Sequence, residues 1–101
     1  MRKYAILISP EAQADIENFF YHICFVYKQP LTAARNRDGL YKAIKQLSVY
    51  AGSIAVSQND FVQSHFGPGA RCISYKKMVI IYVMYGAYAN IKRVIPGALI
   101  Y

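Results

Sequence analysis

The sequence predicts an α+β fold in the order β-α-α-β-β-β, with an N-terminal strand and a helical hairpin packed on one face of a small, mainly antiparallel sheet. Three observations carry this prediction. Residues 71–95 contain three apolar runs whose connections are so short that they favour hairpins. Before Ala51, two stretches repeat apolar residues at helical spacing. A chain of 101 residues that is 55% hydrophobic can bury one modest core, so we expect a single domain over residues 1–101.

The first half of the chain opens with a strand followed by a helix. Lys3–Ile8 is a short apolar run typical of a strand. Ser9 then offers an N-cap, Pro10 a first helical residue and Glu11 an acid in the first turn. The helix should end near residues 27–29, before Pro30. Its expected inner stripe consists of Ala12, Ile16, Phe19, Phe20, Ile23 and Tyr27.

A second helix is expected from Pro30, antiparallel to the first because only two or three residues connect them. Its expected inner stripe consists of Ala33, Arg37, Leu40, Ile44 and Leu47. Arg37 fits poorly among apolar residues, and we expect its stem to pack along the helix with its charged head in water. Residues 51–69 show little periodicity, and two interpretations stay open: a short edge strand around Phe61–Phe66, or a mobile functional loop.

The second half of the chain should supply the rest of the sheet. Strands are expected at Arg71–Lys76, Met78–Tyr85 and Tyr88–Ile95, with a tight corner at Lys76-Lys77 and a turn at Gly86. Pro96 cannot donate to a strand ladder and should end the last strand. The apolar tail Ala98–Tyr101 should pack back on the domain or against a partner. The helical hairpin should leave the other face of the sheet partly open, with the basic residues near it.

Composition argues against several classes of protein. No uncharged run is longer than the 14 residues of Met78–Ile91, whereas a membrane-spanning helix needs roughly 20. Met1-Arg2-Lys3 leads into only a short apolar run, which does not resemble a secretion signal, so we expect a cytoplasmic protein. Cys24, Cys72 and the two histidines lack the spacing of a metal site, and we expect no metal or other cofactor.

The charge is unevenly distributed. Residues 61–101 contain five basic residues and no acid, whereas residues 1–60 contain seven basic and five acidic residues. The two parts carry +5 and +2, which gives the net charge of +7. A sheet half without carboxylates favours a polyanionic or acidic partner, although a basic balance also serves to keep a small apolar domain soluble.

Five short motifs occur in order along nearly the whole chain. They are Ser-Pro-Glu-Ala at Ser9–Ala12, Ala-Ile-x-x-Leu at Ala43–Leu47, Gly-x-Arg at Gly69–Arg71, Tyr75-Lys76, and Ile-x-Arg-Val-Ile at Ile91–Ile95. This ordered set resembles the RelE/ParE superfamily, the toxins of bacterial type II toxin–antitoxin (plasmid stabilisation) modules. The resemblance implies the RelE/ParE-like fold and an acidic antitoxin partner that folds on binding.

The resemblance also implies one of two activities. RelE-like members cleave mRNA on the ribosome and use several Lys or Arg, or a Glu–Arg–His set, with a C-terminal Tyr. ParE-like members inhibit DNA gyrase. Arg71 matches the sheet arginine of the family, and Arg93 matches an arginine common in the last strand of ParE-like members. Beyond it, where many members carry His or Arg, this chain has Pro96–Leu99, whose side chains cannot transfer a proton. We therefore favour the ParE-like branch.

Two alternatives stay open beside the gyrase inhibitor. In a ribosome-dependent endoribonuclease, Arg71, Arg93 and Tyr101 would be the catalytic candidates. A homologue that binds its antitoxin without being toxic is the other alternative. The candidate residues for binding target or antitoxin are Arg71, Lys76, Lys77, Lys92, Arg93, Leu99 and Tyr101.

Structural roles compete with functional ones at several of these positions. Arg71 is equally well explained as a structural arginine of the sheet. Arg93 shares strand parity with Ile91 and Ile95, so it either points toward the core near an edge or is redirected by a bulge. Lysines at a hairpin corner are usually solvated.

Overall fold

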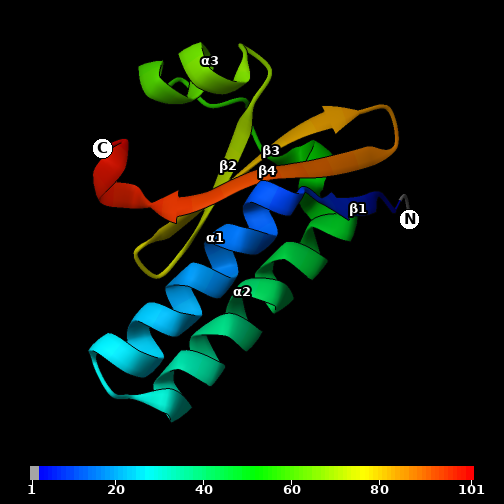
Figure 1. Ribbon diagram of the computed structural model, residues 1–101. Helices are drawn as coiled ribbons and strands as arrows, with labels where there is room; N and C mark the ends of the chain where they lie inside the picture. The colour runs from blue at the N-terminus through cyan, green and yellow to red at the C-terminus, as the bar shows by residue number, and fades with distance from the viewer. Residues whose placement is uncertain (1–2) are drawn as a thin grey trace.

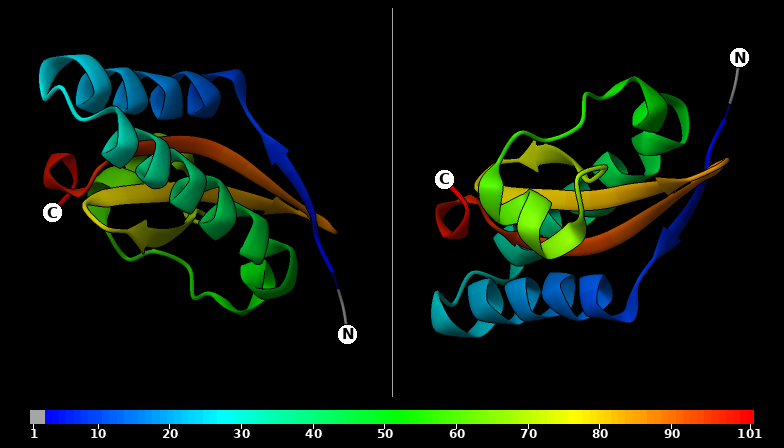
Figure 2. Two further views of the ribbon diagram at one scale, coloured as in Figure 1. Left: turned by 90° about the horizontal axis from the view of Figure 1, so that it is seen from below. Right: turned by 90° about the horizontal axis from the view of Figure 1, so that it is seen from above.

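The computed structural model describes residues 3–101 and has three layers. The elements are β1 (Ala5–Ile8), α1 (Pro10–Tyr21), a π-helical turn (His22–Val26), α2 (Pro30–Tyr50), a 3₁₀ turn (Ala51–Ser53), α3 (Asp60–Phe66), β2 (Arg71–Tyr75), β3 (Met78–Tyr85), β4 (Tyr88–Pro96) and a last 3₁₀ turn (Gly97–Leu99). Helices α1 and α2 form a hairpin on one face of the sheet, and α3 lies on the other face (Figures 1 and 2). The predicted order of elements is confirmed, with α3 added to it.

The sheet has the order β1-β4-β3-β2. Strands β2, β3 and β4 form two successive antiparallel hairpins, as their short connections predict. Strand β1 pairs in parallel with the first part of β4, from Ala5 opposite Tyr88 to Ile8 opposite Ile91. The first strand is therefore an edge strand, and β2 forms the other edge.

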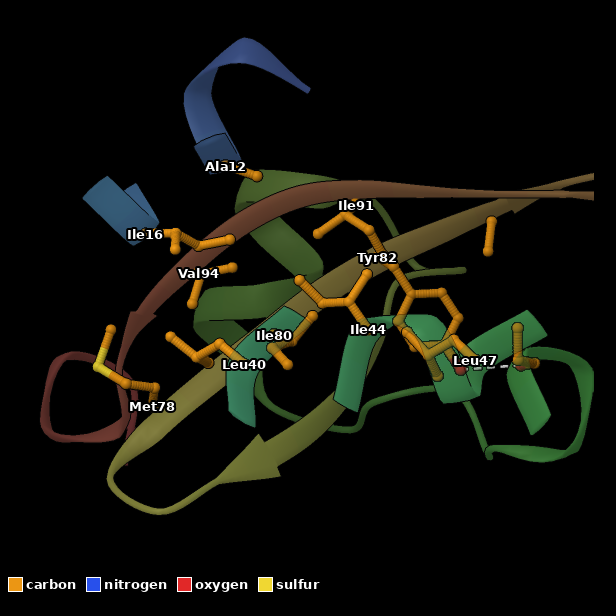
Figure 3. Close-up of a cluster of buried hydrophobic side chains, with 12 residues drawn as sticks. Ala12, Ile16, Leu40, Ile44, Leu47, Met78, Ile80, Tyr82, Ile91 and Val94 are labelled. Carbon is orange, nitrogen blue, oxygen red and sulfur yellow. Dashed lines mark hydrogen bonds between the residues drawn. The ribbon is translucent and has the colours of Figure 1, made fainter. Parts of the chain in front are cut away.

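The main core lies between the helical hairpin and the sheet (Figure 3). Ile16 of α1 and Leu40 and Ile44 of α2 are buried against Ile80 and Ile91 of the sheet. Tyr75 also packs on this side, directly against Gly39 of α2, where a Cβ would overlap the tyrosine ring. Glycine at this position lets β2 approach the helix closely.

A smaller core lies on the opposite face of the sheet. Val62 of α3 and Ile100 of the tail pack there with Val79, Ile81 and Ile95. At the far end of this face Tyr85 and Tyr88 are exposed. The expectation of a partly open second face is therefore confirmed, but α3 and the tail cover more of it than the sequence indicated.

Residues 51–69 differ from both interpretations of the sequence. Phe61–Phe66 belongs to a helix, and the expected edge strand there is wrong. Asn59 caps this helix, because its side chain accepts a hydrogen bond from the Val62 amide at 3.1 Å. The only strand-like pairing described in this segment is an isolated bridge between Val56 and Arg71.

The inner stripes of the two long helices also need correction. Tyr27 is 61% exposed, because the π-helical turn from His22 to Val26 interrupts the α-helical spacing. In α2 the inward position belongs to Asn36, which is buried, whereas the guanidinium of Arg37 lies 4.1 Å from the centre of the Phe20 ring. The charged head of Arg37 thus packs across the hairpin on Phe20, where the sequence led us to expect it in water.

Replacing Leu40 with Ala should show that the interface between hairpin and sheet supports the fold. Leu40 is fully buried, so the change should lower the free energy of unfolding by about 2–5 kcal/mol. Leu31→Ala in the same helix is the matched control, because Leu31 is 75% exposed and should change stability by less than about 0.5 kcal/mol. Urea unfolding followed by circular dichroism measures both, and equal effects would contradict the core described here.

Candidate functional site

Arg71 is held by the turn that follows α2. Its Nη1 donates to the carbonyl oxygens of Ala51 (3.2 Å), Gly52 (3.0 Å) and Ile54 (2.9 Å). The Ala51 carbonyl also accepts a hydrogen bond from the buried hydroxyl of Tyr82 at 2.8 Å. Burial raises the pKa of Tyr82 to about 12, an effect that the nearby charge of Arg71 partly opposes. Arg71 therefore faces the helical layer and ties the end of α2 to the sheet, rather than lying near the open face as expected.

Arg93 forms a two-bond ion pair with α1. Its Nε and Nη2 donate to the two carboxylate oxygens of Asp15 at 2.6 and 2.9 Å. Asp15 also accepts a hydrogen bond from the backbone amide of Val94 at 2.9 Å. The hydrogen bonds to Asp15 raise the pKa of Arg93. These contacts join α1 to the edge of β4.

A β-bulge beside Arg93 moves this residue off the face of the sheet that carries Ile91. Ile81 pairs with Arg93 and the next residue, Tyr82, pairs with Ile91, so Lys92 is an extra residue in β4. The bulge changes which residues of β4 face the hairpin. Ile91 before it and Val94 after it both enter the main core, although they are three residues apart. Of the two possibilities raised for Arg93, redirection by a bulge is the one observed.

The three candidate lysines lie in different surroundings. Lys76 Nζ donates to the side-chain oxygen of the buried Asn36 at 2.7 Å, and its backbone has a φ of 53° in the turn between β2 and β3. Lys77 is exposed, and its carbonyl accepts a hydrogen bond from the Gly97 amide at 2.8 Å. Lys92 Nζ lies 5.5 Å from the centre of the Tyr85 ring. The turn at Lys76 and Lys77 therefore contacts both the hairpin and the tail.

The tail packs back on the domain by one residue and leaves its neighbours exposed. Ile100 is buried, and its carbonyl accepts a hydrogen bond from the Asn59 side chain at 2.7 Å. Leu99 and Tyr101 are 62% and 77% exposed. The expectation that the tail packs on the domain is thus confirmed, and two large side chains remain on the surface.

Two grooves lie between the helical hairpin and the strands or tail beside it. One, of about 340 Å³, separates α1 from the end of β4 and the tail. It is lined by Asp15, Asn18, Phe19, His22, Met78, Arg93, Val94, Ile95, Pro96 and Leu99. The other, of about 440 Å³, lies between β1 and α2 and is lined by Tyr4, Ile6, Ile8, Tyr41, Ile44, Lys45 and Ser48. We call them the α1 groove and the β1 groove.

The structure gathers only part of the predicted set of site residues. Arg93 and Leu99 line the α1 groove together, and Lys77 adjoins this end of the sheet through its bond to Gly97. Arg71, at the other end of β2, does not line this groove. The sequence did not indicate that His22 and Phe19 line a groove, because its pattern shows them only as residues of an amphipathic helix. No residue pattern pointed to the β1 groove.

The described residues also bear on other kinds of site. Within residues 3–101, no group of three or more His, Cys, Asp or Glu side chains is placed to hold a metal ion. Cys24 and Cys72 are free, and burial raises the pKa of the Cys72 thiol. None of the helices described has both the length and the apolar character needed to span a membrane.

Comparison with known proteins gives a likeness in structure alone. No protein-family model and no curated protein matches the sequence. The fold is similar to that of a chain in a solved structure described as "Chromosomal ParDE TA system from P. aeruginosa". The TM-score is 0.76 and the identity 19%, over 93% of this chain and 96% of that chain. The ParE-like fold implied by the sequence motifs is therefore confirmed.

Replacing Asp15 with Ala should weaken the attachment of α1 to β4. The change removes both bonds to Arg93 and leaves the Val94 amide without its acceptor. Loss of hydrogen bonds to a charged group should lower the free energy of unfolding by about 1.5–3 kcal/mol. Glu17→Ala, two residues along the same helix, is the control and should change stability by less than about 0.5 kcal/mol. If thermal unfolding shifts both variants alike, Asp15 does not hold the edge.

Proposed function

We propose that this protein is the toxin of a type II toxin–antitoxin module, neutralised in the cytoplasm by a cognate antitoxin, and that its target is DNA gyrase. The observation that carries this proposal is the fold, shared over 93% of the chain with a chain of a ParDE system. The ordered motifs from Ser9 to Ile95 also support it.

The environment of the two candidate arginines supports a binding protein over a ribonuclease. Stabilising the phosphorane of RNA cleavage requires cations whose donors are free to reach a phosphate. Arg71 already donates to three backbone carbonyls, and Arg93 is engaged by Asp15. Tyr101 is exposed, yet as a general base it would need a strongly lowered pKa. These bonds favour structural roles for both arginines.

Surfaces suited to an antitoxin lie at the edge of the sheet and in the two grooves. Strand β1 is an edge strand, and the apolar β1 groove runs beside it against α2. An extended peptide could pair with this edge while its side chains enter the groove. The α1 groove, with Leu99 at its rim, offers a second place for apolar anchors. We propose Lys76, Lys77, Lys92, Leu99 and Tyr101 as partner contacts.

One prediction of the proposed function concerns the target. Expression without antitoxin should arrest growth with filamentation and DNA damage, and purified protein should inhibit supercoiling by gyrase while leaving mRNA intact. A supercoiling assay, with mRNA cleavage on purified ribosomes run in parallel, decides the matter. Cleavage within codons at the ribosomal A site would instead favour the endoribonuclease. If neither activity appears but an antitoxin binds, the protein is a non-toxic homologue.

Another prediction concerns the antitoxin, which we expect to be the acidic product of a neighbouring short gene. Binding should be accompanied by folding of the antitoxin and burial of about 1,000–3,000 Å², and hence by a marked negative heat-capacity change in calorimetry. Leu99→Ser combined with Tyr101→Ser should raise the Kd at least tenfold while Ile100 keeps the tail packed.

A matched control separates this effect from a general loss of exposed apolar side chains. Tyr50 and Tyr88 are 56% and 51% exposed and lie outside both grooves, so Tyr50→Ser combined with Tyr88→Ser should leave antitoxin affinity within twofold of wild type. A heat-capacity change near zero would refute coupled folding. Equal affinity of the tail and control variants would remove Leu99 and Tyr101 from the contact.

A further inference from the structure

The tip of the helical hairpin carries a concentrated apolar surface. Five large side chains from the end of α1, the π-helical turn and the start of α2 are each more than half exposed: Tyr21 (51%), Phe25 (66%), Val26 (62%), Tyr27 (61%) and Leu31 (75%). We call this set the tip patch. The hairpin carries it away from the sheet and from α3 (Figure 1). The rest of the described chain therefore does not cover it.

The π-helical turn places Tyr27 in the tip patch. At α-helical spacing Tyr27 would continue the inner stripe that includes Ile23, which is buried. The turn instead closes with a bond from the Tyr27 amide to the His22 carbonyl at 3.4 Å, and the wider turn changes the direction of the residues that follow. Since Ile23 and Ala33 already fill the interior of the hairpin, the exposed side chains are not needed for the core. Such turns are frequent at functional sites.

The aromatic rings of the tip are held in place by one another. Tyr21 stacks on Phe25 with the ring centres 5.7 Å apart, and Phe20 meets Tyr21 edge to face at 5.5 Å. His22 and Tyr27 form another edge-to-face pair at 5.1 Å. Rings that are ordered before binding lose little conformational freedom when a partner arrives. Tyr and Phe are also enriched at protein interfaces.

Charge indicates what kind of partner the tip patch suits. Residues 18–37 contain Lys28, Arg35 and Arg37 and no carboxylate. Lys28 and Arg35 are exposed, and Arg37 lies over the Phe20 ring. A second copy of the chain would bring the same basic residues and its own net charge of +7, which disfavours self-association through this surface. An acidic partner would be attracted instead.

We propose that the tip patch is the surface by which this protein holds its cellular target, an acidic protein that covers the aromatic rings. The inference rests on the proposed function and deepens it, because it separates the surface for the target from the β1 groove that we propose for the antitoxin. The β1 groove is lined by the later turns of α2, from Tyr41 to Ser48, whereas the tip patch includes Leu31 at its start. An antitoxin strand in the β1 groove and the target at the tip would thus contact opposite ends of α2.

A matched pair of double variants tests the proposal, with purified DNA gyrase as the probe. Tyr21→Ser with Tyr27→Ser removes two exposed tyrosines from the tip, and Tyr50→Ser with Tyr88→Ser removes two of similar exposure elsewhere. We expect the tip variant to bind gyrase at least tenfold more weakly than wild type, and the control variant to stay within twofold. Both should melt near the wild-type temperature, and both should bind the antitoxin unchanged. Wild-type binding to gyrase should weaken as salt is raised.

Several results would overturn the inference. If wild type binds gyrase and the tip variant binds equally well, the tip patch is not the target surface, although the proposed function stands. If the tip variant loses antitoxin affinity instead, the antitoxin covers the patch. If sedimentation shows a dimer for wild type and a monomer for the tip variant, a second copy covers it. If wild type does not bind gyrase at all, the proposed target is wrong and the inference fails with it.

Discussion

The structure depends on how the backbone groups at the edge of β4 find hydrogen-bond partners beyond the end of β1. Strand β1 covers β4 only as far as Ile91, and the backbone groups beyond that point need other partners. The Ser9 hydroxyl donates to the Lys92 carbonyl at 2.9 Å while accepting from the Ala12 amide, and Asp15 accepts from the Val94 amide. Two residues later on the same side comes Pro96, which has no amide hydrogen to pair. The start of α1 thus completes the sheet.

The need to satisfy these backbone groups explains much of the structural role of the two candidate arginines. Because Asp15 lies at the edge of β4, where it accepts from the Val94 amide, both of its carboxylate oxygens can also accept from Arg93. Arg71 plays a similar part at the C-terminal end of α2, because the last carbonyls of a helix lack partners within the helix. Arg71 and Arg93 are candidates for a binding site in the sequence, but in the structure they hold helices to the sheet.

Most of the fold could be predicted from the sequence, because its elements have local signals. Ser9-Pro10 marks a helix start, and the short connections around Lys76-Lys77 and Gly86 force hairpins. What could not be predicted depends on non-local contacts. The helix Asp60–Phe66 is only 7 residues long and gains its support from the second face of the sheet, which a linear pattern does not reveal. Periodicity predicts an inward Tyr27 because it assumes an uninterrupted α-helix, and nothing in the sequence indicates the π-helical turn.

The site was less predictable than the fold for a related physical reason. Basic residues are easy to find in a sequence, but their function depends on whether a carboxylate or carbonyl already engages them, as Asp15 engages Arg93. Exposed apolar side chains are harder to find, because Phe25 and Leu31 look like core residues until the hairpin is built. With a likeness of 19% identity, the shared fold fixes the framework and leaves such surfaces free to differ. We therefore expect the residues that select a partner to be those that the fold does not need for its core, namely the exposed side chains of the hairpin tip and of the tail.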